Sequence, residues 1–198
     1  MTRNLVTVGE HTIDANLLTP NGYVLDAGAR DFIFARGLAE RGCRVVAIDA
    51  DPTVENPRIV GVAFANVALD DAPRKRTFVM DQDPQARRLD TRGNGPLVDV
   101  HTVTVEDIMA RYEVKHWDVV KLDIEGAEMA VLAAWPGPIA TQISVEFHEH
   151  CAPKPQSYYD SIFARLESQG YEIVQHVKEA RMCCSANWWD TLICLKGA

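Results

Sequence analysis

The stretch Gly22-Tyr-Val-Leu-Asp-Ala-Gly28 is a short apolar run that ends at a glycine, the pattern of a buried strand followed by a tight turn. Apolar residues at helical spacing follow from Asp31 to Arg41, and Gly42 is a stop signal for that helix. A second apolar run, Cys43–Asp49, indicates another buried strand. Strand, helix and strand in this order form the unit of a parallel sheet, so the sequence predicts an α/β fold.

The rest of the chain continues this alternation. Strands are predicted at 58–69, 77–80, 117–123 and 141–148, and helices at 104–112, 125–135 and 157–169. Two last strands, at 171–177 and 190–196, are expected to pair as a hairpin. Residues 81–96 hold two prolines, two glycines and three arginines, so we predict a loop or flap there. We expect one domain over residues 1–198 that closes with antiparallel strands.

Composition and charge exclude several function classes. The formal net charge of -8 argues against a nucleic-acid partner, because such binding depends on clusters of Lys and Arg, and the only basic run is 74–76. The sequence has no stretch of about 18 apolar residues and no signal-peptide layout, so we expect no membrane association and a cytoplasmic location. The five cysteines lack metal or redox spacing and are expected to be free thiols.

Acidic and glycine residues at the ends of the first two strands predict a nucleoside-binding site. In an open parallel sheet, ligands lie beyond the carboxyl ends of the strands. Asp26 and Gly28 hold this place on the first strand, and Gly28 permits a sharp turn and the close approach of a ligand. Asp49 ends the next strand at about the 20-residue offset of a ribose-binding acid, with Asp51 as the alternative.

The first turn also indicates which nucleoside cofactor binds. A dinucleotide fingerprint needs three glycines there, and the three places hold Gly28, Arg30 and Ile33. This disfavours an NAD(P)-dependent oxidoreductase, which we keep as an alternative. A cofactor without phosphates needs no such cradle, which favours S-adenosylmethionine, and Asp26 would help to hold its amino-acid end directly or through water.

Several stretches resemble, in order, the motifs of FkbM-type methyltransferases. They are Leu25-Asp-Ala-Gly-Ala-Arg30, Val46-Ala-Ile-Asp-Ala-Asp-Pro52, Asn66-Val-Ala-Leu-Asp70, Val119-Val-Lys-Leu-Asp-Ile-Glu-Gly-Ala-Glu128 and Ser144-Val-Glu-Phe-His148. The resemblance implies a Rossmann-like class I methyltransferase fold, with a mostly parallel seven-stranded sheet and an antiparallel C-terminal hairpin. It also implies S-adenosylmethionine as methyl donor and usually an oxygen acceptor, here a hydroxyl of a small molecule or a carbohydrate.

The resemblance assigns roles to residues one by one. It implies that Asp26, Gly28 and Ala29 form the donor-binding turn and that Asp49 is the ribose-binding acid. It also implies that Asn66 lies at the adenine pocket and that Asp123 and Glu125 belong to the active-site rim. Asp123 is placed both beside the donor and on the rim. The sequence departs from the family where Arg30 and Phe32 replace a common Asn and Gly. This departure keeps open a catalytically inactive nucleoside-binding module of the same fold.

Methylation of an alcohol requires removal of a proton, and side chains at the ends of the strands predicted at 117–123 and 141–148 are suited to this. The candidates for catalysis are Asp123, Glu125, Glu146 and His148. Strand alternation places Glu146, His148 and His150 on one face. His148 is the preferred general base, because its unperturbed pKa of about 6.5 is near neutral pH. The alternative is that His148 packs at the rim of the core.

The same cluster permits a divalent metal ion, which we do not favour. Asp123, Glu146 and His148 form one possible ligand set, and His148, His150 and Cys151 form another, but neither has a diagnostic spacing.

Other side chains near this cluster have two interpretations each. Lys121 either orients a carboxylate or substrate, or pairs with Asp118, and Glu128 is expected to cap or balance the amino end of its helix. Four aromatic residues either line an acceptor pocket or pack in the core, namely Tyr158, Tyr159, Trp188 and Trp189.

Overall fold

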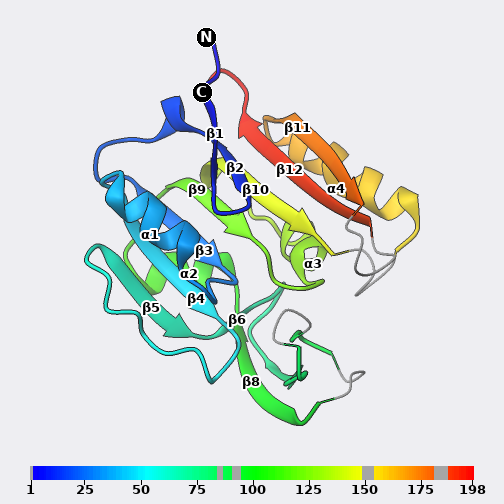
Figure 1. Cartoon of the computed structure of the whole chain (residues 1–198). Coiled ribbons are helices and arrows are strands. Elements are labelled where there is room, and N and C mark those ends of the chain that lie inside the picture. The colour runs from blue at the N-terminus through cyan, green and yellow to red at the C-terminus, as the bar shows by residue number, and fades with distance from the viewer. Residues whose placement is uncertain (1, 84–86, 91–94, 149–153, 181–186) are drawn as a thin grey trace.

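A large mixed sheet forms the centre of the computed structural model, which describes residues 2–83, 87–90, 95–148, 154–180 and 187–198 (Figure 1). Its strands are β3 (Tyr23–Ala27), β4 (Arg44–Asp49), β5 (Val62–Asn66), β9 (Trp117–Leu122), β10 (Ala140–Phe147), β11 (Tyr171–Ala180) and β12 (Asn187–Leu195). Their order is β11-β12-β10-β9-β3-β4-β5. Neighbours from β5 to β10 are parallel, and β12 is antiparallel to both β10 and β11. The predicted α/β class is confirmed.

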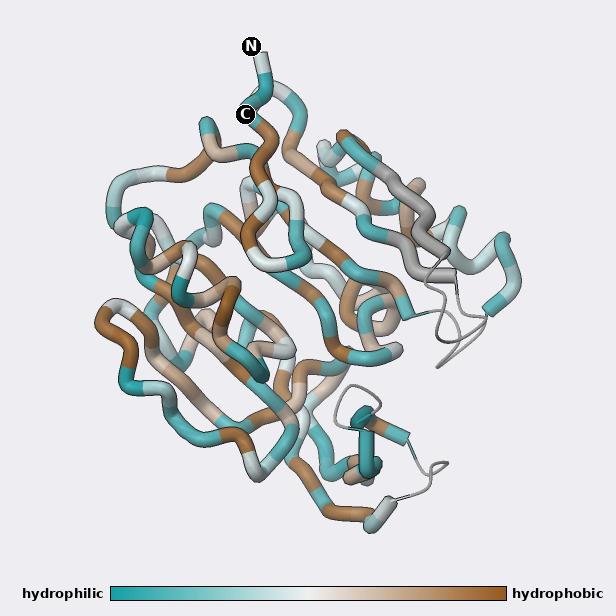
Figure 2. Tube along the Cα trace, in the orientation of Figure 1, coloured by the Kyte–Doolittle hydropathy of each residue, from teal (hydrophilic) through white to brown (hydrophobic). Residues whose placement is uncertain are grey.

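Different elements cover the two faces of this sheet. The helix α1 (Ile33–Glu40) and the hairpin of β1 (Leu5–Val8) and β2 (His11–Asp14) cover one face (Figure 1). The other carries α2 (Val105–Arg111), α3 (Glu128–Ala133) and α4 (Gln156–Ser168). Because side chains alternate along a strand, Val24 packs in the core under α1, whereas Leu25 packs in the core on the opposite face. Figure 2 shows hydrophobic segments along the central strands.

A second, smaller sheet lies beside the carboxyl ends of the large one. It contains β6 (Ala68–Leu69), β8 (Leu97–Val103) and β7 (Lys75–Val79), in the order β6-β8-β7. The strand predicted at 58–69 is therefore two strands, β5 and β6, in different sheets. The sequence patterns did not predict β1, β2, β8 or the short 3-10 helix Ala15–Leu17. β8 lacks an apolar run, because its residues alternate between exposed and half-buried positions.

The first residues of two helices show how local side chains and backbone conformation set where a helix begins. At α2, the Thr104 hydroxyl accepts from the backbone N–H of Asp107, and the Asp107 carboxylate accepts from the backbone N–H of Thr104, which together form a capping box. At α1, Phe32 adopts a left-handed φ of 56°. That conformation costs a non-glycine residue about 1–2 kcal/mol. Packing of the buried Phe32 ring against Phe64, 5.2 Å away, offsets this cost.

Within the described ranges, no helix is long and apolar enough to cross a membrane.

Candidate functional site

A cavity of about 630 Å³ lies at the carboxyl ends of β3, β4, β9 and β10. Its wall includes Gly28 after β3, Asp49 at the end of β4, Asp123 after β9 and Glu146 near the end of β10. Cavities of about 300–1,000 Å³ typically bind small molecules. The β1–β2 turn and parts of the segment 81–96 border the same space, so the predicted loop lies beside the site.

Gly28 is required by the backbone geometry of the first turn. Its φ is +82°, and a Cβ at this position would lie 1.8 Å from the carbonyl oxygen of Asp123. The glycine therefore permits the sharp turn and also lets the ends of β3 and β9 approach each other. The adjacent Ala29 is buried, its N–H donates to the carbonyl of Ile48 at 3.1 Å, and it does not line the cavity.

Asp49 is the better placed of the two acids after β4. Its buried carboxylate lines the cavity, and burial raises its pKa to about 6. Asp51 also lines the cavity, but its carboxylate already accepts from the N–H and hydroxyl of Thr53 and pairs with Arg87 at 2.5 Å. Asn66, expected at the adenine pocket, does not line the cavity; it is exposed, and its amide donates to the Asp51 carbonyl at 2.9 Å.

Lys121 joins the ends of β3 and β9. Its buried ammonium lies 3.1 Å from Asp26 Oδ1 and 3.3 Å from Asp123 Oδ2, and it donates to the Gly28 carbonyl at 2.7 Å. Burial alone would lower the pKa of Lys121, but the two carboxylates raise it above its usual value. Lys121 thus orients carboxylates, whereas Asp118 accepts from the Thr19 hydroxyl at 2.8 Å. Asp26 itself does not line the cavity.

His148 lies behind the cavity wall among four acids. Its Nδ1 is 2.9 Å from Glu128 Oε1, and its Nε2 is 3.6 Å from Glu125, 3.7 Å from Asp123 and 3.9 Å from Glu146. Burial alone would lower the pKa of His148, but Glu128 and the other carboxylates raise it to about 10. A raised pKa argues against the predicted role of His148 as a general base near neutral pH.

The loop between β9 and α3 presents Glu125 to the cavity. Glu125 has a left-handed φ of 53°, and burial raises its pKa to about 8. Glu128 holds this loop by accepting from the N–H groups of Ile124 and Gly126, both at 3.0 Å. Glu128 thus lies in the first turn of α3 (Glu128–Ala133), as predicted, but its carboxylate accepts from the preceding loop and contacts His148.

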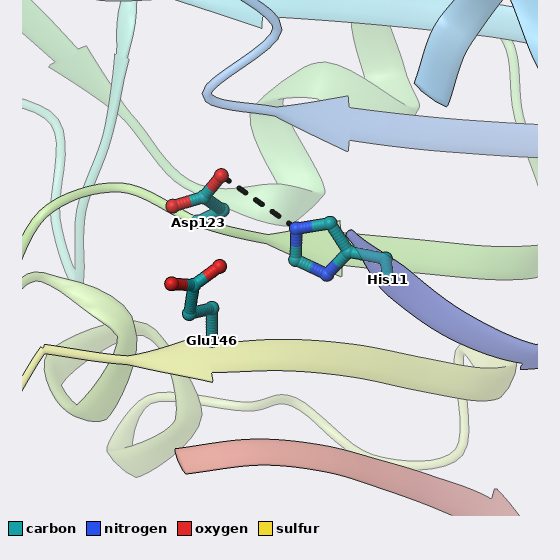
Figure 3. A group of neighbouring side chains, drawn as sticks. All are labelled: His11, Asp123 and Glu146. Carbon is teal, nitrogen blue, oxygen red and sulfur yellow. Dashed lines mark ion pairs between the residues drawn. The ribbon is translucent and has the colours of Figure 1, made fainter. Parts of the chain in front are cut away.

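His11 is the residue of this site that sequence reasoning missed. It projects from the β1–β2 hairpin toward Asp123 and Glu146 (Figure 3). Its Nε2 is 3.6 Å from Asp123 Oδ2, and its Nδ1 is 3.3 Å from the Ser144 hydroxyl. No motif surrounds residue 11, and the hairpin precedes the motif-bearing strands. The only available signal was a histidine within the short alternating run His11-Thr-Ile-Asp14.

The family of this chain follows from its match to a known family model. The family model described as Methyltransferase FkbM domain matches residues 26–173. The chain belongs to the FkbM methyltransferase family. The match runs from Asp26 in β3 to Ile173 in β11 and includes every cavity-lining strand end described above, while the β1–β2 hairpin of this FkbM-family chain lies outside it. No curated protein matches the chain in sequence.

Solved structures share the fold of this FkbM-family chain at low identity. A protein described as a hemolysin from Streptococcus thermophilus matches with a TM-score of 0.54 and 10% identity, over 92% of this chain and 62% of the other. The Methanococcus jannaschii fibrillarin pre-rRNA processing protein matches with a TM-score of 0.54 and 11% identity, over 99% of this chain and 84% of the other. The FkbM chain therefore spans less than two thirds of the hemolysin.

The cavity of the FkbM chain fits S-adenosylmethionine, the donor that its family and fold support. The buried Asp49 carboxylate suits ribose hydroxyls, and Leu69 and Phe78 provide apolar wall for a purine. Arg30 and Ile33 border the cavity where a dinucleotide site would need glycines. The wall therefore suits a nucleoside without a pyrophosphate.

Some predicted site residues of the FkbM chain are placed away from the cavity or lie beyond the described part. Tyr158 and Tyr159 pack with the core on α4 and do not line the cavity. His150, Cys151 and the side chains of Trp188 and Trp189 lie outside the described residues.

Proposed function

We propose that this chain transfers the methyl group of S-adenosylmethionine to a hydroxyl oxygen of a small-molecule or carbohydrate acceptor. The observation that carries this proposal is the cavity wall, on which the nucleoside-suited Asp49 and the acids Asp123, Glu125 and Glu146 border the same space. One part of the wall suits a donor nucleoside, and the other can hold an acceptor and take its proton.

The donor end is assigned to Asp49, Gly28 and the residues that position them. Asp49 accepts hydrogen bonds from the ribose hydroxyls, and Gly28 leaves the turn without a side chain. Asp26 acts through Lys121, which fixes Asp123 and the Gly28 carbonyl. S-adenosylmethionine supplies an electrophilic methyl group when bound.

The acceptor end is assigned to Glu125, with His148 as a positioning residue. Glu125 borders the cavity and its side chain is 20% exposed, so it can reach a hydroxyl and accept its proton. His148 is buried behind the wall and faces Glu125, Asp123 and Glu146 through one nitrogen. It therefore holds these acids in place, because alignment of acceptor and methyl group carries much of the rate.

Methyl-labelled S-adenosylmethionine tests this proposal against a panel of sugars, phenols and their amine analogues. We expect label on hydroxyl compounds, and Glu125→Gln should lower kcat by about 100-fold or more while donor affinity stays unchanged. The matched control is Asp99→Asn, which removes an exposed carboxylate paired with Lys75 on the small sheet. Label found on the amines alone, or full turnover by Glu125→Gln, would contradict the proposal.

A further inference from the structure

Three side chains from three strand ends bring potential metal ligands together on the cavity wall. His11 extends from β2, Asp123 follows β9 and Glu146 lies on β10 (Figure 3). One ring nitrogen and one oxygen from each acid all lie within 4.8 Å of one another. All three residues line the cavity. The hairpin thus adds an imidazole to two acids that the motif-bearing strands already provide.

The state of the His11 ring is an independent sign of a ligand. The residue is only 3% exposed, and its Nε2 has no hydrogen-bond partner among the described residues. Nε2 forms an ion pair with Asp123 Oδ2 at 3.6 Å, a separation too long for a hydrogen bond. The other nitrogen lies 3.3 Å from the Ser144 hydroxyl. Metal-binding histidines commonly use the second nitrogen in this way to fix the ring.

The charge balance around this point also favours a cation. Five acidic side chains gather near only two basic ones, Lys121 and His148. The acids are Asp26, Asp123, Glu125, Glu128 and Glu146. Buried charge of one sign is costly unless it is paired or coordinates a metal. A bound divalent cation would reduce this excess of negative charge.

We propose that His11, Asp123 and Glu146 bind a divalent first-row transition metal ion, for which Mn²⁺ is a suitable probe. Imidazole combined with carboxylates suits such ions. The other compact group, Asp123 with Glu125 and His148, is less suited, because His148 does not line the cavity.

An ion at this place would have open positions toward the cavity. Three protein ligands leave room for water or an acceptor hydroxyl, and a metal ion lowers the pKa of a bound hydroxyl and orients it. This use of the ion rests on the proposed methyl transfer, whereas binding of the ion does not. The two claims can therefore fail separately.

Titration of the metal-free full chain with Mn²⁺, followed by the electron paramagnetic resonance signal of free Mn²⁺, tests the site. We expect one bound ion per chain and at least about tenfold weaker binding in His11→Gln and in Glu146→Gln. The matched control is His116→Gln, since His116 is exposed and contacts Thr141 at the opposite ends of the strands. This control should bind Mn²⁺ as the unaltered chain does.

Several results would overturn the metal site. They are absence of Mn²⁺ binding, unchanged affinity in both variants, or loss of binding in His148→Gln with retention in His11→Gln. Because His11 is buried, cooperative thermal unfolding must be verified for each variant, and His11→Asn replaces one that does not fold. Methyl transfer without Mn²⁺ binding would refute only the metal site, whereas Mn²⁺ binding without methyl transfer would refute only the proposed function.

Discussion

Replacing Asp49 by Asn should separate stability from donor binding. Burial raises the pKa of Asp49 from 3.8 to about 6, so the unliganded fold binds the Asp49 proton more tightly than the unfolded chain does. The contribution of Asp49 to the free energy of unfolding is most favourable below about pH 4. It declines between pH 4 and 6 and stays low above pH 6. At pH 7.5 the buried charge costs up to about 3 kcal/mol. Asp49→Asn removes this cost and keeps the oxygen that accepts from the Asp51 N–H.

The same substitution should weaken donor binding. The ionised Asp49 would accept one or two charge-assisted hydrogen bonds from ribose, each worth about 1.5–3 kcal/mol. If only the carboxylate form binds the donor, the affinity of the unaltered chain should fall about tenfold between pH 7.5 and pH 5. The Asn variant should bind more weakly than the unaltered chain at pH 7.5, with no pH dependence over this range.

Thermal unfolding without ligand and calorimetry with S-adenosylmethionine measure the two effects. Asp49→Asn should raise the unfolding temperature at pH 7.5 and lower the donor affinity, whereas the surface control Asp99→Asn should change neither. Equal donor affinity in Asp49→Asn and the unaltered chain, or an affinity independent of pH from 5 to 7.5, would refute the reasoning.

Three further substitutions test the supporting structure. Gly28→Ala should destabilise the fold by about 2–4 kcal/mol in urea unfolding, because the new Cβ would overlap the Asp123 carbonyl at a positive φ; unchanged stability would contradict this turn geometry. Lys121→Met leaves Asp26 and Asp123 without their shared cation and should cost about 3–5 kcal/mol, a loss that should be smaller in a chain that also carries Asp26→Asn. Thr104→Ala should cost about 1 kcal/mol through loss of the α2 cap, with donor affinity unchanged.

The central strands could be predicted because each is a buried apolar run with a clear end. Gly28 and Asp49 mark two of these ends, and both line the cavity. The predicted strand at 58–69 was less accurate, since a change from one sheet to another at Val67 leaves no break in an apolar pattern. The left-handed backbone of Phe32 was not predictable either, because glycine is the residue that usually indicates this conformation.

The electrostatic state of the site could not be predicted from the sequence. His148 was expected to titrate near neutral pH, but its pKa depends on Glu128, which is the first residue of a different element, α3. His11 reaches Asp123 only because the hairpin folds over the sheet, and no spacing rule joins two residues so distant in sequence. Strand periodicity thus located the carboxylates, whereas their partners required the three-dimensional structure.

Calorimetric titration of the chain with S-adenosylmethionine, and separately with NAD, tests the central claim most directly. The account predicts saturable binding of one S-adenosylmethionine per chain, no binding of NAD, and a marked loss of donor affinity in Asp49→Ala. Absence of binding to S-adenosylmethionine, or equal affinity in the Asp49→Ala variant, would contradict it.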